Sequence, residues 1–254
     1  MENFLGLPLN ASANGAEIDR VLILVHWLIF ALFIGWSIFL VVVLIRFRKK
    51  KNPQASYTGV RNRTSIYVEI GVALFEVILL TGFSIPLWSK RVNDIPKEQN
   101  ATVVHIVAEQ FSWNIHYPGP DGKFGRTDIH LVSDDNPIGL DRNDPNAKDD
   151  ITTVNDLHLP VNKPALIYLS SKDVVHSLSI PVMRIKQDAI PGQVIPVWFV
   201  PTVANNDSVP TYDIACAQLC GLGHYRMRGY LTVQSQKDFD EWMKEQEESL
   251  AQAQ

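Results

Sequence analysis

The chain contains only two cysteines among 254 residues, and they stand close together at positions 216 and 220. This scarcity excludes a disulfide-rich fold. No Cys-x2-Cys-His sequence occurs, so we expect no covalently attached c-type haem in this chain. The formal net charge is -4, and the main basic run lies between two hydrophobic segments. This distribution of charge argues against a nucleic-acid partner.

Two long segments, 21–45 and 66–88, contain almost only apolar residues. A transmembrane helix needs about 20 such residues, so we predict two membrane spans in contact with lipid. No positively charged region precedes the first run, so we expect no cleaved signal peptide. The absence of a targeting segment fits a bacterial cell membrane.

No acidic residue occurs between Arg46 and Arg63, a segment that carries seven basic residues. Because basic loops stay on the cytoplasmic side, the N-terminus and everything after Trp88 are predicted to lie outside, on the periplasmic side. The spans therefore form a hairpin within residues 1–95.

Two carboxylates, Glu69 and Glu76, interrupt the second span. Their spacing of seven residues places them on one face of a helix. Carboxylates in a span usually face protein or water rather than lipid. A proton-path contact and a buried polar packing contact both remain open, and Glu69 also fits an interfacial position.

Residues 96–234 show short apolar or alternating runs separated by turn signals. This pattern predicts an antiparallel sandwich or barrel. The expected strands are 102–108, 111–117, 127–132, 151–159, 165–170, 177–180, 194–200, 211–215 and 229–233. The Asp-rich stretch 133–150 is predicted to be a solvated loop, since its spacing does not match a calcium-binding template. The tail, 235–254, is predicted to be helical, with Ser235 and Asp238 as a capping box.

The most informative stretch is Cys216-x3-Cys220-x3-His224-x2-Met227, and His176 is a candidate for one further ligand. Soft sulfur ligands with imidazole suit copper, and we favour two thiolates bridging two coppers, each of which also holds one histidine. A mononuclear copper site would leave one cysteine surplus. A Cys2His2 zinc site would leave Met227 idle. A disulfide would leave both histidines and the methionine unexplained.

These motifs, together with Asp188-Ala-Ile-Pro-Gly192, resemble subunit 2 of the haem–copper cytochrome c oxidases over roughly residues 20–235. The resemblance implies a cupredoxin-like β-domain, a Greek-key barrel or sandwich, that holds the dinuclear copper A centre. Cys216 and Cys220 would bridge both coppers. His176 and Met227 would complete one copper, and His224 with the backbone carbonyl of Gln218 would complete the other.

The same resemblance implies a function in electron transfer. Electrons would arrive one at a time from a cytochrome c, soluble or tethered to a complex, and pass to haem in subunit 1. There oxygen is reduced to water and protons are pumped, so this chain is expected to be an enzyme subunit with other oxidase subunits as partners. Glu69 matches the glutamate at the start of a proton path into subunit 1. No haem ligands are evident in the two spans of this chain.

Two departures from the family pattern bear on this interpretation. Gln218 stands where a glutamate usually helps to bind magnesium at the subunit interface, and a neutral amide is a weaker ligand, which argues against that ion. Phe111 replaces the tryptophan through which electrons usually arrive, which leaves the identity of the donor open. Gln193 also replaces a frequent arginine, and no consequence is assigned to that change.

Three rival classes remain to be weighed. Nitrous-oxide reductase carries a similar copper site, but the hairpin and the short chain argue against it. A quinol oxidase subunit without copper conflicts with the full ligand set. A membrane-anchored binding domain stapled by a Cys216–Cys220 disulfide would tolerate replacement of His176 and Met227.

Overall fold

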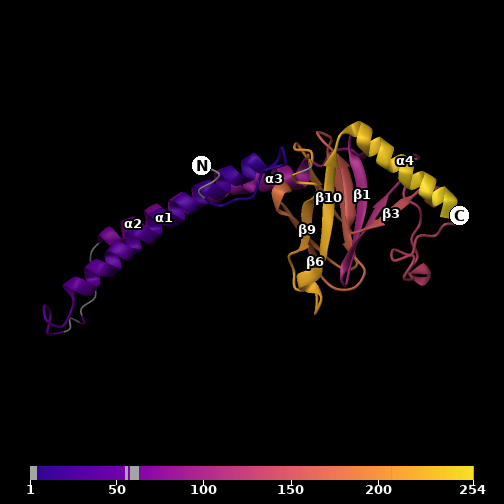
Figure 1. Ribbon diagram of the computed structural model, residues 1–254. Coiled ribbons are helices and arrows are strands. Elements are labelled where there is room, and N and C mark those ends of the chain that lie inside the picture. The colour runs from indigo at the N-terminus through magenta and orange to yellow at the C-terminus, as the bar shows by residue number, and fades with distance from the viewer. Residues whose placement is uncertain (1–4, 55–56, 58–62, 207, 254) are drawn as a thin grey trace. The chain divides into compact units, whose positions relative to one another are not determined.

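The computed structural model describes residues 5–54, 57, 63–206 and 208–253. The chain forms two units (Figure 1). One contains the helical segment Glu17–Asn93, and the other contains Gly6–Ala16 together with Asp94–Gln254. The three-part division drawn from the sequence, with boundaries at 95 and 234, stays a prediction.

The helical unit carries two apolar segments that are long enough to cross a membrane. The first is α1 (Gly15–Arg46); the second consists of α2 (Arg63–Leu79), a π-helical turn η2 (Leu80–Ser84) and α3 (Ile85–Asn93). Pro86 follows the π turn, and a proline ring clashes with the carbonyl four residues earlier, so a local widening of the helix accommodates it. The two predicted spans are confirmed as long apolar helices.

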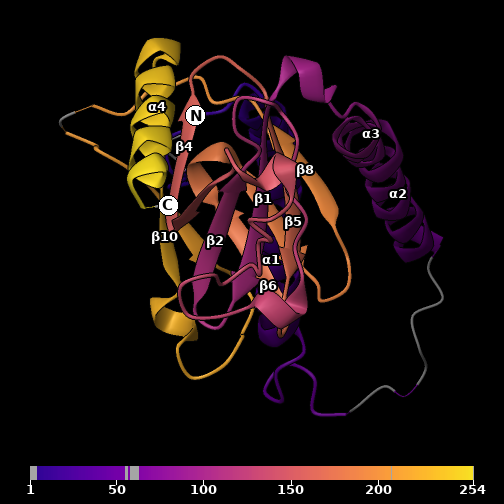
Figure 2. The same cartoon turned by 90° about the vertical axis from the view of Figure 1, so that its right-hand side faces the viewer.

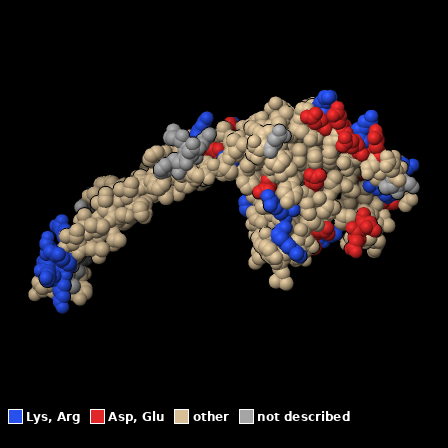
Figure 3. Space-filling model, in the orientation of Figure 1, with Lys and Arg blue, Asp and Glu red and all other residues tan. Residues whose placement is uncertain are grey.

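Apart from Glu69 and Glu76 on α2, the charged residues described in this unit lie near the ends of its helical segments. Lys90 Nζ lies 2.9 Å from Glu17 Oε1, which joins the start of α1 to the last turn of α3. Figure 3 shows a largely uncharged surface along the helices and a group of basic side chains near one end. That group includes the described residues Arg46, Arg48, Lys49, Lys50 and Lys51.

The second unit is a sandwich of two five-stranded sheets (Figure 2). One sheet has the order β3-β2-β1-β5-β8, and the other has the order β4-β10-β9-β6-β7. The strands are β1 (Thr102–Glu109), β2 (Ser112–Tyr117), β3 (Ile151–Val154), β4 (Asp156–Pro160), β5 (Ala165–Ser171), β6 (His176–Ile180), β7 (Ile185–Ala189), β8 (Ile195–Phe199), β9 (Tyr212–Cys216) and β10 (Arg228–Gln234).

The predicted all-β fold is confirmed, but its strands are not all antiparallel. β1 pairs with β5 in parallel, and β10 pairs with β4 in parallel. These pairs join strands that are distant in the sequence, and the alternation of apolar residues carries no information about strand direction. Direction therefore depends on long-range topology.

Two of the expected strands need correction, and one strand was not expected. Residues 151–159 form two strands in different sheets, because Asn155 has a φ of 60° and interrupts the run. Its side chain accepts a hydrogen bond from the Trp113 N–H at 2.8 Å. The expected strand 127–132 is wrong, since it contains the 3-10 turn η4 (Ile129–Leu131). β7 was missed, because its Lys-Gln-Asp centre does not alternate clearly.

The core lies between the two sheets and is closed at one side by helix α4 (Gln236–Ala253). The predicted capping box is present, since Ser235 Oγ accepts from the Asp238 N–H at 3.1 Å and donates to its carboxylate at 2.7 Å. Phe239 is buried, and Trp242 stacks on His158 with ring centroids 4.1 Å apart. The apolar side chains of this helix therefore pack against the sandwich.

A short N-terminal segment, residues 10–14, also belongs to the sandwich. The Ala11 N–H donates to the Val182 carbonyl at 2.8 Å, and the Ala13 N–H donates to the Val200 carbonyl at 3.0 Å. Ala11, Ser12 and Asn14 are buried. The segment thus bonds to backbone groups that follow β6 and β8, one from each sheet.

Candidate metal centre

Five sulfur- and nitrogen-bearing side chains converge at one end of the β6–β9–β10 sheet. His176 opens β6 and Cys216 ends β9, and these strands are paired so that Leu178 faces Cys216. Met227 immediately precedes β10, and its carbonyl accepts from the Cys216 N–H at 3.3 Å. The ligand loop between them, residues 217–226, brings Cys220 and His224 back over the strand ends.

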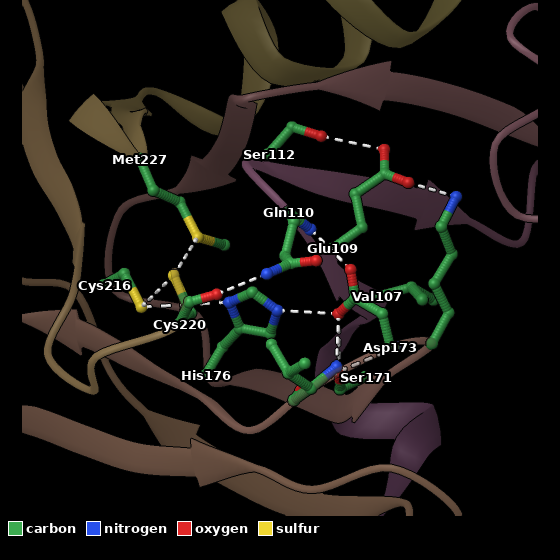
Figure 4. A network of polar contacts seen from close by, with 12 residues as sticks. Val107, Glu109, Gln110, Ser112, Ser171, Asp173, His176, Cys216, Cys220 and Met227 are labelled. Atoms are coloured by element: carbon green, nitrogen blue, oxygen red, sulfur yellow. Dashed lines mark hydrogen bonds and ion pairs between the residues drawn. The ribbon is translucent and has the colours of Figure 1, made fainter. Parts of the chain in front are cut away.

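The donor atoms form two sulfur–imidazole pairs around the two cysteines. Cys216 Sγ lies 3.9 Å from His176 Nδ1, and Cys220 Sγ lies 3.7 Å from His224 Nδ1. The two Sγ atoms lie 3.8 Å apart, and Met227 Sδ lies 3.8 Å from Cys220 Sγ (Figure 4 draws all of these residues except His224). A disulfide has a length of about 2.05 Å, so this distance leaves both cysteines as free thiols.

A backbone oxygen also reaches this cluster. The carbonyl of Gln218 lies 3.1 Å from Cys216 Sγ, whereas the side chain of Gln218 is exposed. The carbonyl oxygen therefore lies beside the sulfur and imidazole donors. A hard oxygen beside soft sulfur and imidazole groups is compatible with a borderline metal such as copper.

Asp173 orients the imidazole of His176. Its Oδ1 atom accepts from His176 Nε2 at 2.8 Å and from the Val174 N–H at 2.6 Å. Burial raises the pKa of Asp173, but these bonds and one from the Gln110 N–H outweigh burial and hold the pKa below its usual value. The Nε2–H tautomer leaves the lone pair of Nδ1 directed at the cluster.

The thiol of Cys220 is held in its protonated form when no metal is bound. Burial raises its pKa to about 11, and the neighbouring Cys216 adds to that shift. Thiolates rather than thiols bind metals, so a cation that binds here must displace protons. The buried, inward-facing donors fit a soft or borderline metal, and His176, Cys216 and Cys220 form a compact group able to hold one.

Phe111 packs beneath the ligand loop, where glycines make room for its ring. A Cβ atom on Gly223 would lie 2.4 Å from Phe111 Cδ2, and one on Gly221 would lie 3.2 Å from Phe111 Cζ. Gly221 also has a φ of 133°, which favours glycine. The tight turn of this loop therefore depends on small residues at both positions.

Sequence reasoning missed two residues beside the cluster, Gln110 and Asp173. Asp173 stands three residues before His176, and that spacing was an available signal. Gln110 had no local signal, because its contacts are with chain segments far away in the sequence. Glu69 and Glu76 both lie on α2 in the helical unit and are exposed there, so they are not among the residues that the sandwich brings together.

Apolar helices long enough to cross a membrane, followed by a β-sandwich with sulfur and imidazole donors at one end, define a membrane-anchored protein of the cupredoxin-like class. Residues 102–234 match the model of the family described as cytochrome c oxidase subunit II, periplasmic domain. The chain belongs to the cytochrome c oxidase subunit II family. It is thus a subunit of a haem–copper oxidase, an oxidoreductase, as the resemblance predicted.

Individual relatives are also named as subunit 2 of cytochrome c oxidase. The alternative cytochrome c oxidase subunit 2 of Bradyrhizobium diazoefficiens is 32% identical over 236 residues, which cover 92% of this chain and 82% of that one. The probable cytochrome c oxidase subunit 2 of Rickettsia conorii is 28% identical over 226 residues, covering 86% of this chain and 66% of that one. The crystal structure of the periplasmic domain of subunit II (CoxB) of Bradyrhizobium japonicum is 24% identical with a TM-score of 0.44, covering 61% of this chain and 99% of that one.

Proposed function

We propose that this chain is the subunit through which electrons enter the oxidase, and that its cluster holds a dinuclear copper A centre. Cys216 and Cys220 would bridge both coppers, with His176 and Met227 on one and His224 and the Gln218 carbonyl on the other. The bound coppers would supply a centre that accepts and releases one electron at a time. Residues of this chain supply its ligands and surroundings.

The observation that carries this proposal is the arrangement of the donors in two sulfur–imidazole pairs. Each thiol lies against one histidine nitrogen, at 3.9 and 3.7 Å, and the two thiols lie against each other. A mononuclear copper site uses two histidines and one cysteine around a single point. Two pairs with adjacent sulfurs suit two metal ions that share the thiolates.

The protein around the cluster restricts both movement and water. Cys216 and Met227 are tied to the ends of paired strands, and Cys216, Cys220 and Met227 are each less than 10% exposed. Asp173 holds the ring of His176 in one orientation and one tautomer. Ligands held in this way change position little when an electron arrives, which favours fast transfer.

The wider function follows from family membership and remains part of the proposal. Electrons would come from a cytochrome c-type donor and continue to haem in subunit 1, where oxygen reduction and proton pumping take place. Glu69 would lie at the start of a proton path into subunit 1. The exposed amide of Gln218 offers a weak ligand for magnesium, so we do not include that ion.

The membrane orientation is proposed from the charges. Arg46, Arg48 and Lys49–Lys51 would remain on the cytoplasmic side of a bacterial inner membrane. The sandwich would then lie in the periplasm with its cluster accessible to an external donor.

The test is a copper count and an electron paramagnetic resonance spectrum of the full-length chain, purified in detergent and reconstituted with copper. Two coppers per chain, with hyperfine structure from one electron shared between them, would support the proposal. One copper with ordinary hyperfine structure would replace it with a mononuclear site. Absence of copper binding under reducing conditions would overturn it.

A further inference from the structure

Gln110 hydrogen-bonds to both segments that carry the proposed copper ligands. It lies in the turn between β1 and β2, in the other sheet from the ligands, and its side chain is exposed. Its backbone N–H donates to Asp173 Oδ2 at 2.7 Å, and its side-chain Nε2 donates to the carbonyl of Cys220 at 2.5 Å (Figure 4). Gln110 thus links Asp173, which orients His176, to the backbone of Cys220.

The neighbours of Gln110 hold the turn itself in place. Glu109 forms an ion pair with Lys172 and accepts from Ser112 Oγ at 2.8 Å. The Lys172 N–H donates to the Ala108 carbonyl at 3.1 Å, and its Nζ donates to the Pro137 carbonyl at 3.0 Å. Gln110 therefore projects from a fixed base rather than from a mobile loop.

The side-chain bond of Gln110 has no evident replacement on the ligand loop. The ring of Phe111 fills the space under Gly221 and Gly223, but it contributes no hydrogen-bond donor. The Cys220 carbonyl belongs to a loop whose glycines give it conformational freedom. A donor held at 2.5 Å from that carbonyl limits how far Cys220 can swing away from Cys216.

We propose that Gln110 is a positioning residue for the metal centre, whose side-chain amide fixes the Cys220 backbone and so sets the distance between the two thiols. The importance of Gln110 for electron transfer rests on the function proposed above. The placement of the thiols itself can be tested without metal.

The experiment compares three substitutions in the full-length chain. Gln110→Glu has the same shape but cannot donate when ionised, and Gln110→Met has a similar length and no donor or charge. Gln110→Lys keeps a donor on a longer side chain. All three retain the backbone N–H that donates to Asp173. Gln252→Glu, near the end of α4, is the matched control for an added charge at an exposed glutamine.

The first readout is the rate at which a maleimide labels the two thiols of the reduced, metal-free protein. A hydrogen bond of ordinary net strength lowers the population of the open ligand loop about fivefold. The thiols of the Glu and Met variants should therefore be labelled about fivefold faster. The Lys variant and the control should react at the wild-type rate. Loss of one hydrogen bond should lower the thermal unfolding midpoint by only about 2 to 4 °C, whereas loss of the fold would abolish the cooperative transition, so the melting curve separates a positioning role from loss of the fold.

The second readout is the hyperfine pattern of the copper-loaded protein. The Glu and Met variants should show unequal sharing of the electron, whereas the Lys variant should match the wild type. A change in the hyperfine pattern of the Glu variant alone would mean that the added charge is the cause. Equal changes in all three variants would mean that side-chain shape is the cause. Either result overturns the proposal, and so does the absence of any change. If the wild type binds no copper, the proposed function fails, but the labelling rates still decide the role of Gln110.

Discussion

Nε2 of His176 lies 2.8 Å from Oδ1 of Asp173, while Nδ1 of the same ring faces the sulfur of Cys216 at 3.9 Å. The carboxylate thus determines which nitrogen is available to a metal. This contact is contained within four residues of sequence, and it leads to the first of four predictions.

Replacement of Asp173 by alanine should weaken copper binding by about 10- to 100-fold, the usual effect of removing the partner of a ligand histidine. Asp173→Asn keeps an acceptor oxygen for Nε2–H and should lie between alanine and the wild type. Competition with a copper chelator, followed by the visible spectrum, measures the change. Wild-type affinity in the alanine variant would show that the carboxylate does not orient the ring.

Replacement of Met227 by leucine should alter the copper spectrum while leaving the fold intact. Met227 is 2% exposed, and a swap of similar volume in a core costs about 1 kcal/mol or less. Met183→Leu is the matched control, since Met183 is fully buried and outside the ligand cluster. A spectrum identical to that of the wild type would remove Met227 from the ligand set.

The sandwich should lose stability on acidification through His105. Burial, reinforced by the nearby His116, lowers the pKa of His105 from 6.5 to about 4. Below pH 6.5 the unfolded chain therefore binds a proton that the folded chain excludes. The contribution of this residue to folding is present in full above pH 6.5 and falls as the pH drops toward 4.

The pH effect can be isolated with a substitution. Between pH 7 and pH 4.5, His105→Gln should lose about 2 to 3 kcal/mol less stability than the wild type. Denaturant unfolding at several pH values measures this difference, and His130→Gln, in an exposed turn, is the control. Parallel pH profiles for wild type and His105→Gln would contradict the assignment.

Asn14→Ala should destabilise the sandwich, even though Asn14 precedes the first predicted span. Its Oδ1 accepts from the Val200 N–H at 3.0 Å, and Asn14 is buried. A buried donor left without a partner costs about 1 to 3 kcal/mol. Thermal unfolding of the full-length chain, compared with that of the exposed Asn100→Ala variant, should show a lower midpoint for Asn14→Ala alone.

The candidate site was largely predictable from the sequence because four of its side-chain donors lie within twelve positions of one another. Their spacing reflects a single loop, so local reasoning was sufficient. His176 lies in a distant segment, and it became a candidate only because the donors of the loop were one ligand short. Gln110 could not be inferred in this way, because its two bonds connect segments that only the folded sandwich brings together.

The strands were predicted where apolar residues run continuously or alternate, and the errors lie where that pattern is weak. Asn155 interrupts an apolar run and moves the chain from one sheet to the other, a change that depends on its bond with Trp113. The N-terminal contacts of Ala11 and Ala13 use backbone groups, which leave no mark in the side-chain pattern. Both features depend on tertiary contacts, which the local sequence does not reveal.

The contact between Phe111 and Gly223 links two positions that are distant in the sequence. A side chain of any size at position 223 would meet the ring of Phe111 at 2.4 Å. A bulkier aromatic residue at position 111 would likewise require the ligand loop to move away from that position. Exchange of the ligand loop between members of this family should therefore succeed only when the residue at position 111 is transferred with it.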